Sequence, residues 1–163
     1  MLGHHLIAAV CLYAFLRHRK LDRAAAFVGG IALIASTPWL IHKASNLLMP
    51  MAWTPLVWIL TDRLLDKPTL RRAVFLAGGV YLAGSAGSPP GFFYTLVMGV
   101  AYGAYRGVFA LIESHRSGEL KGYLLRLLPL LLVAALLSVG LLWVSVAPGL
   151  ELSEFTPRAK RNL

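Results

Sequence analysis

The chain has 163 residues, of which 58% are hydrophobic and only 14% are charged, and its mean hydropathy is +0.68. A soluble globular domain carries about 25% charged residues, so this composition argues against a soluble globule and for a chain that lies in lipid. The net charge of +9 does not indicate nucleic-acid binding, because no module that gathers Lys and Arg on one face is visible. The charges fall instead in short runs between apolar stretches, which is typical of a polytopic helical membrane protein.

Six apolar segments follow one another along the chain, and we expect each to be a helix. They cover residues 2–16, 24–41, 50–65, 73–84, 91–112 and 123–147. About 20 residues cross the hydrocarbon core of a bilayer, so the last two segments are long enough to span and the third and fourth are short. We therefore predict an all-α fold, a polytopic transmembrane helical bundle of about six segments with two of them short.

The first segment has no Lys or Arg before it and is followed at once by Arg17, Arg19, Lys20 and Arg23. This order is the reverse of a secretory signal peptide, so we expect the N-terminus to lie outside the cytoplasm. Such a start is unusual for a complete protein. We expect the chain to be an internal or truncated piece of a longer one.

The basic residues also predict which connections face the cytoplasm. If the six segments alternate across the membrane, twelve of the 16 Lys and Arg residues fall on one side, which the positive-inside rule makes cytoplasmic. The opposite side receives Lys43, an uncharged connection over 85–90 and the tail with Arg158, Lys160 and Arg161. We expect a multi-pass protein of the bacterial inner membrane, with a transmembrane helical domain over 1–148. Residues 149–163 would be an extracytoplasmic tail or the start of a missing region.

The stretch "GSAGSPPG" separates the fourth segment from the fifth. Pro89 and Pro90 lack backbone donors, and Ser88 is disfavoured in helical geometry because it precedes a proline. The fourth helix should therefore stop near Gly84, and Gly87, Pro89 and Pro90 should form a structural turn. A backbone that leaves helical geometry in a membrane must be surrounded by protein or water, so we predict a polar recess that faces outward.

An acid within a membrane is a functional hypothesis by default. Five acids lie beside basic residues on the predicted cytoplasmic side, where local ion pairing and solvation account for them: Asp22, Asp62, Asp66, Glu113 and Glu119. On the outer side, Glu151 and Glu154 either help to bind a polar substrate or belong to a solvated tail. The histidines show no metal-ligand spacing, so we expect no metal site and no cofactor is evident.

Four stretches carry a resemblance to a known family. In chain order they are "HHLIAAVCLYAFLRHRKLDRAAAFVGGIALIASTPWLIH", "PMAWTPLVWILTDRLL", "GSAGSPPGFFYTL" and "APGLELSEFTPR". Their order and spacing resemble the middle part of YfhO-like bacterial membrane proteins and related GT-C type glycosyltransferases. In those proteins a Trp-x-Pro-Leu segment is followed by a Gly-His-Pro-Gln-like turn before an aromatic helix start, and a proline, a glutamate and a Ser-Pro-Arg-like triplet close the stretch. This chain departs from that pattern: Ser88 stands in place of His, Gly91 rather than Gln follows Pro90, and Thr156 replaces Ser. The resemblance covers most of the chain and implies a GT-C-like fold.

The resemblance implies transfer of a sugar from a polyprenyl-phosphate-linked donor at the extracytoplasmic face. The candidate substrate-binding residues that it implies are Trp53, Ser88, Tyr94, Glu151 and Arg158. Arg158 would pair with the donor phosphate, since guanidinium binds phosphate oxygens in a fork. The family's catalytic acid would lie upstream of Met1, so we expect no catalytic residue in this chain and no activity of the chain alone. A divalent metal would belong to the parent enzyme.

Two other interpretations stay open, and with them the question of whether the chain is part of an enzyme. One is a noncatalytic membrane assembly subunit or truncated remnant, which the missing acid favours. The other is a small transporter, which normally has polar or ionisable residues within its spans; the last span offers only Ser138 and Ser145. The expected partners are the lipid bilayer, the rest of a longer chain or neighbouring helices, and, by the resemblance, a polyprenyl-phosphate sugar.

Overall fold

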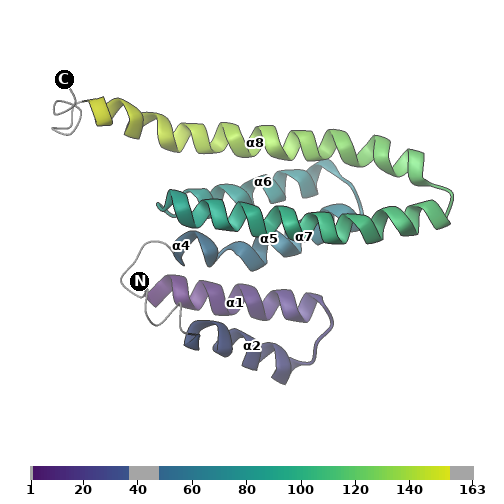
Figure 1. Ribbon diagram of the computed structural model, residues 1–163, viewed down its shortest axis with the longest axis horizontal. Helices are drawn as coiled ribbons and strands as arrows, with labels where there is room; N and C mark the ends of the chain where they lie inside the picture. The colour runs from purple at the N-terminus through teal and green to yellow at the C-terminus, as the bar shows by residue number, and fades with distance from the viewer. Residues whose placement is uncertain (1, 37–47, 155–163) are drawn as a thin grey trace.

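The computed structural model describes residues 2–36 and 48–154, and all regular secondary structure within these ranges is helical. The helices lie alongside one another in an elongated arrangement, with α2 at one edge and α8 at the other (Figure 1). Their bounds are α1 (Leu2–His18), α2 (Arg23–Ala35), α4 (Leu48–Met51), α5 (Thr54–Asp66), α6 (Leu70–Gly84), α7 (Pro89–Arg116) and α8 (Leu120–Glu154). The prediction of an all-α fold is confirmed.

The second and third predicted segments differ from the helices that form. α2 begins where the Asp22 carboxylate accepts a hydrogen bond from the Ala25 N–H at 2.7 Å. It ends at Ala35, and residues 37–41 of the predicted segment lie outside the described residues. The third segment is not one helix but two, because Pro55 has no N–H with which to bond the Met51 carbonyl. Pro55 lies instead in the first turn of α5, where the missing donor is tolerated.

The break between the fourth and fifth segments lies where the sequence predicted it. α6 ends at Gly84, and Gly87 adopts a φ of +87°, in the left-handed region that glycine tolerates. Pro89 and Pro90 do not form the turn itself, which corrects that expectation: they are the first two residues of α7. A proline in the first turn of a helix sacrifices no hydrogen bond, so the turn is made by the residues before them.

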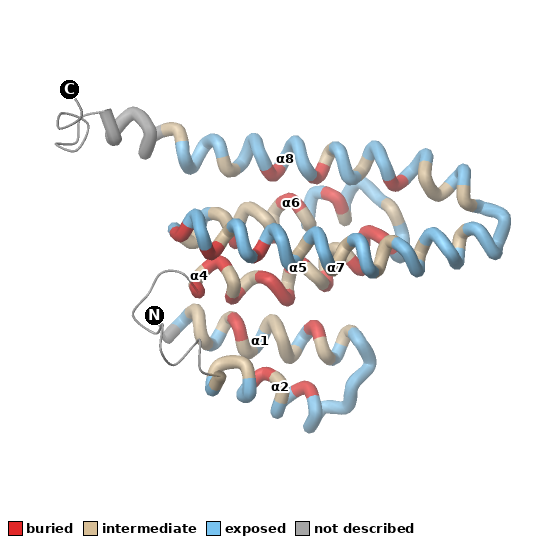
Figure 2. The backbone as a smooth tube through the Cα atoms, in the orientation of Figure 1, coloured by how far each residue is buried: buried red, intermediate tan, exposed pale blue. Residues whose placement is uncertain are grey.

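Two described helices are long and apolar enough to cross a membrane. They are Pro89–Arg116, with a hydropathy of 1.4, and Leu120–Ala147, with a hydropathy of 2.6; only 6% and 17% of their most apolar windows are buried. Figure 2 shows long exposed stretches along both helices. A helix that is hydrophobic all round is normally buried in a core or in a membrane. Two such exposed helices indicate membrane association.

The packed interior consists of small seams between neighbouring helices. One buried cluster joins α5, α6 and α8 through Leu64, Ala73 and Leu127, and another joins α1 and α4 through Ala8 and Leu48. Beyond these seams, α5 packs against α1, α6 and α7. These contacts bring the end of α1, the end of α5 and the middle of α7 to one place.

Candidate functional site: a buried aspartate network

Asp62 is the centre of a polar network that lies inside the bundle. It belongs to the last two turns of α5, and its side chain is 0% exposed. An ionised carboxylate is costly to remove from water unless it is paired and hydrogen-bonded. The surroundings of Asp62 must therefore supply both charge and donors.

Four side chains from two other parts of the chain supply those donors. On α7, the Arg106 Nε donates to Asp62 Oδ1 at 2.6 Å, and the Tyr102 hydroxyl donates to Oδ2 at 2.8 Å. At the end of α1, His18 Nε2 lies 3.3 Å and Arg19 Nη1 3.5 Å from the same Oδ2. Both carboxylate oxygens are thus engaged, and the network links α1, α5 and α7.

Arg106 extends the network to the surface. Its Nη2 lies 3.3 Å from Oδ1 of Asp66, one helical turn further along α5; Arg106 is 20% exposed and Asp66 is 53% exposed. Gly103 of α7 faces Thr61 of α5 near this contact, where a Cβ would lie 3.5 Å from a methyl carbon of Thr61, an ordinary van der Waals distance.

An aromatic cluster lies beside the network. The rings of Phe15, Trp58 and Tyr102 contact one another, with centroids 5.1 to 5.6 Å apart. Trp58 is one helical turn before Asp62 on α5, and Phe15 is about one turn before His18 on α1. The cluster therefore lies about one helical turn from the Asp62 carboxylate, toward the start of α5.

The structure corrects the expectation for Asp62. Local ion pairing and solvation were expected, but the carboxylate is fully buried, and its partners on α7 are 40 and 44 residues away. One sequence signal was present: Tyr102 and Arg106 have i, i+4 spacing and so share a helix face. Among the described residues, no group of three or more His, Cys, Asp or Glu gathers into a candidate metal site.

The site residues that the resemblance implied lie at the other end of α5 and α7. Trp53 immediately precedes α5, and its Nε1–H is buried with no acceptor among the described residues. Ser88 caps α7, where its hydroxyl accepts from the Gly91 N–H at 3.4 Å, and Tyr94 is half exposed against Phe93. The hydroxyls of Thr54 and Thr95, 3.2 Å apart, connect α5 and α7 near this end.

The remaining two implied residues are not placed. Glu151 lies on the helical backbone of α8, which continues to Glu154 past the domain boundary predicted at residue 148; its side chain is outside the described part. Arg158 lies outside the described residues altogether. Their roles in substrate binding stay predictions, as does the outward polar recess.

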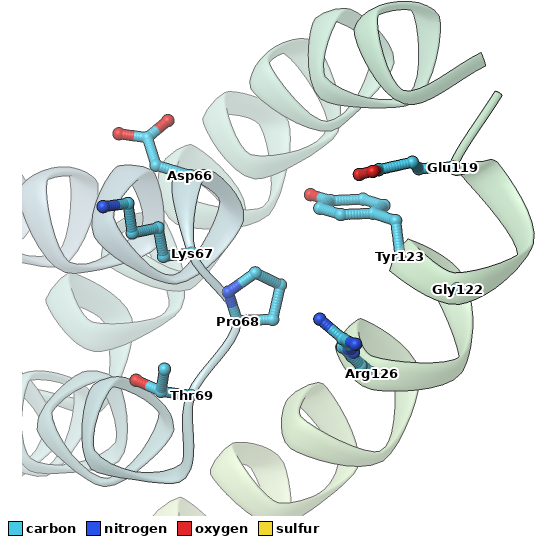
Figure 3. A pocket seen from close by; sticks show the side chains of 8 residues that line it. All are labelled: Asp66, Lys67, Pro68, Thr69, Glu119, Gly122, Tyr123 and Arg126. Carbon is cyan, nitrogen blue, oxygen red and sulfur yellow. The ribbon is translucent and has the colours of Figure 1, made fainter. Parts of the chain in front are cut away.

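Two hollows complete the description. A groove of about 510 Å³ runs between α7 and α8, over α5 and α6, and Trp53, Ser88 and Tyr94 are not among its lining residues. A pocket of about 620 Å³ lies at the opposite end of the bundle, between the α5–α6 connection and the start of α8 (Figure 3). The groove is lined mostly by apolar side chains, and the pocket by charged and polar ones.

Fold and site together define a class of protein: an all-helical, membrane-associated bundle whose helices are tied by a buried ionic network. Comparison of the chain with protein-family models, with curated protein sequences and with solved structures finds no match.

Proposed function

We propose that the chain is the membrane-embedded helical part of a larger glycosyltransferase-like protein of the YfhO-like and GT-C type. Its task would be to hold the hydrocarbon chain of a polyprenyl-phosphate-linked sugar donor, while the residues that catalyse transfer lie elsewhere in the parent protein. The six-pass arrangement in a bacterial inner membrane belongs to this proposal. The observation that carries it is the apolar groove between α7 and α8.

The walls of the groove favour a hydrocarbon occupant. Three hydroxyl residues line it, but each donates to a carbonyl of its own helix: Thr61 to Val57 at 2.8 Å, Thr95 to Gly91 at 3.1 Å and Ser138 to Ala134 at 2.7 Å. The other lining side chains are apolar, such as Leu96, Leu131 and Val139. A polar ligand would lose hydrogen bonds to water there without replacement, whereas an isoprenoid chain would lose none.

The position of the groove fits a ligand with a polar head. Phe92 and Thr95 line one end of it, in the first two turns of α7 that follow the turn at Gly87 and Ser88. In the proposed topology this end faces outward. The sugar and phosphate would therefore lie near the residues that the resemblance assigns to the substrate, while the isoprenoid chain follows α7 and α8 into the membrane.

The test is photo-crosslinking of the purified chain with a polyprenyl phosphate that carries a diazirine on its isoprenoid chain. Val139→Trp fills the groove, and Val144→Trp makes the same change at an exposed position of α8 that does not line it. We expect Val139→Trp to abolish most of the crosslinking to α7 and α8, and Val144→Trp to leave it unchanged. Equal crosslinking of both variants would contradict the proposal.

A noncatalytic assembly subunit is the second candidate, and the Asp62 network favours it. The most buried acid among the described residues is held by four donors from the same chain, which suits a structural tie between helices. In that case the chain would still fold and insert, but the polyprenyl phosphate would crosslink no more to the groove than to other lipid-facing surface.

A further inference from the structure

The pocket at the end of the bundle holds several polar side chains that have no partner. It lies between residues 66–69, which connect α5 to α6, and the first two turns of α8 (Figure 3). Four of its side chains make no hydrogen bond or ion pair with any described residue: Lys67, Thr69, Glu119 and Arg126. All four are exposed at the surface, in contrast to the buried Asp62, both of whose carboxylate oxygens have partners. Unpartnered groups around a hollow are available to a ligand.

The pocket also lies beside the start of a candidate membrane span. The candidate span of α8 begins at Leu120, and Glu119, Tyr123 and Arg126 lie within two turns of that point. Charged and aromatic side chains at the end of a span lie in the interfacial region. A ligand at this place would therefore be a headgroup rather than an acyl chain.

Both positive and negative side chains surround the pocket. Figure 3 shows Glu119 and Arg126 on either side of Tyr123, Asp66 beside Lys67 across the pocket from Glu119, and Thr69 across the pocket from Arg126. Thr69 is the N-cap of α6, yet its side chain makes no capping bond and the first turn has no acidic residue. The first N–H groups of α6 therefore add positive potential across the pocket from Arg126.

We infer that this pocket binds the headgroup of a zwitterionic phospholipid whose phosphate carries a primary ammonium, that is, phosphoethanolamine. The phosphate would lie against Arg126 and the start of α6, and the ammonium against Glu119, because Asp66 is already engaged by Arg106. A primary ammonium has three donors for such a carboxylate. A trimethylammonium has none, and the single ring of Tyr123 does not form the aromatic cage that such a cation requires.

This inference does not depend on the proposed function, because the pocket and the groove share no lining residue. An experiment that refutes headgroup binding in the pocket therefore leaves the proposed function of the groove untouched, and the reverse also holds.

The experiment is native mass spectrometry of the whole chain in detergent with four added probes. These are dihexanoyl-phosphatidylethanolamine, dihexanoyl-phosphatidylcholine, dihexanoyl-phosphatidylglycerol and free phosphoethanolamine. We expect one site that prefers the ethanolamine lipid over the other three. Arg126→Gln should weaken binding of the ethanolamine lipid about tenfold, as the loss of a charge-assisted hydrogen bond does. Glu119→Gln should reduce that affinity to the level of the choline lipid.

Matched controls remove the same charges outside the pocket: Lys121→Gln on α8 and Glu113→Gln on α7. Both should bind the ethanolamine lipid like the unaltered chain, and circular dichroism should show all four variants equally helical. Equal affinity for the ethanolamine and choline lipids, or equal losses in Lys121→Gln and Arg126→Gln, would overturn the inference. Free phosphoethanolamine binding as tightly as the lipid would overturn the assignment to a membrane lipid.

Discussion

Asp62 connects helices that are far apart in the sequence through a single carboxylate. Its donors come from α1 and α7, and the positive charges of Arg19 and Arg106 compensate its burial. Breaking a buried ion pair by removing one partner is strongly destabilising, because the other charge remains in a place of low polarity. The network should therefore contribute more to the fold than the exposed ion pairs at the same end.

Replacing the charge at this position tests that reasoning. Asp62→Asn keeps the side-chain volume but leaves Arg106 without its closest counter-charge, and it should lower the free energy of unfolding by about 3 kcal/mol. Asp66→Asn removes a half-exposed partner of the same arginine and should cost less than about 1 kcal/mol. Unfolding by dodecyl sulfate in mixed micelles, followed by circular dichroism, measures both; equal losses would refute the special role of Asp62.

The phenol of Tyr102 should stabilise the protein only through Asp62. Tyr102→Phe removes the 2.8 Å hydrogen bond and should cost about 1.5–3 kcal/mol, since the acceptor is charged. In the Asp62→Asn background the same change should cost clearly less, because the two groups are directly coupled. Tyr105→Phe is the control, since Tyr105 is 58% exposed and its ring contacts Phe109. A full additive loss in the double variant would contradict the coupling.

The network could be predicted only in part from the sequence. The charges of Asp62 and Arg106 were visible, and ion pairing at this end was expected. What the sequence did not reveal is that α5 and α7 pack with these residues face to face and that the end of α1 covers them. Burial of a charge is a property of that tertiary packing and not of the local pattern.

At the scale of helices, the local chemistry of proline and glycine predicted one boundary and was overlooked at another. The end of α6 at Gly84 followed from the two prolines beyond it. The division of the third segment into α4 and α5 was missed, although Pro55 was in view, because a proline in an apolar stretch also occurs in continuous spans. The positions of proline and glycine in the sequence did not predict which helices pack against one another.

The seam between α1 and α2 offers a test at this scale. A Cβ at Gly30 would lie 2.9 Å from the backbone oxygen of Ala9, whereas a Cβ at Gly78 on α6 would meet no atom within 4 Å. Gly30→Ala should destabilise the protein by about 1–3 kcal/mol, because backbone on α1 must move to make room. Gly78→Ala should stabilise it by up to about 1 kcal/mol through helix propensity.

The two substitutions are expected to change the stability of the protein in opposite directions, so each serves as the control for the other. Thermal unfolding in the same detergent gives both shifts in a single experiment. If Gly30→Ala raised the midpoint as Gly78→Ala does, α1 and α2 would not be in close backbone contact.

At the scale of the whole molecule, the sequence predicted the helical class and the two longest spans, but not how the shorter helices lie in the bilayer. α5 and α6 have 13 and 15 residues, which at 1.5 Å per residue gives about 20 and 23 Å. The hydrocarbon core is about 30 Å thick. Charge asymmetry alone suggested that these segments cross, and helix length alone does not support it.

A pair of matched cysteines tests the proposed sidedness. In a Cys11→Ser background, which removes the single cysteine of the chain, Ser85→Cys and Ser117→Cys place exposed thiols just before and just after α7. In intact bacterial cells an impermeant maleimide should label position 85 and not position 117, which should react only after lysis. Labelling of both in intact cells, or of 117 alone, would rule out the proposed topology.

The short connection between α7 and α8 has a consequence for how the protein is made. Three residues separate the helices, and Gly118 there adopts a φ of +75°, so the two described helices that are long and apolar enough to cross a membrane form a hairpin that can enter the bilayer as one unit. This hairpin is synthesised last among the described helices. The shorter helices therefore leave the ribosome before their partners exist, and the burial of Asp62 must wait until Arg106 has been translated.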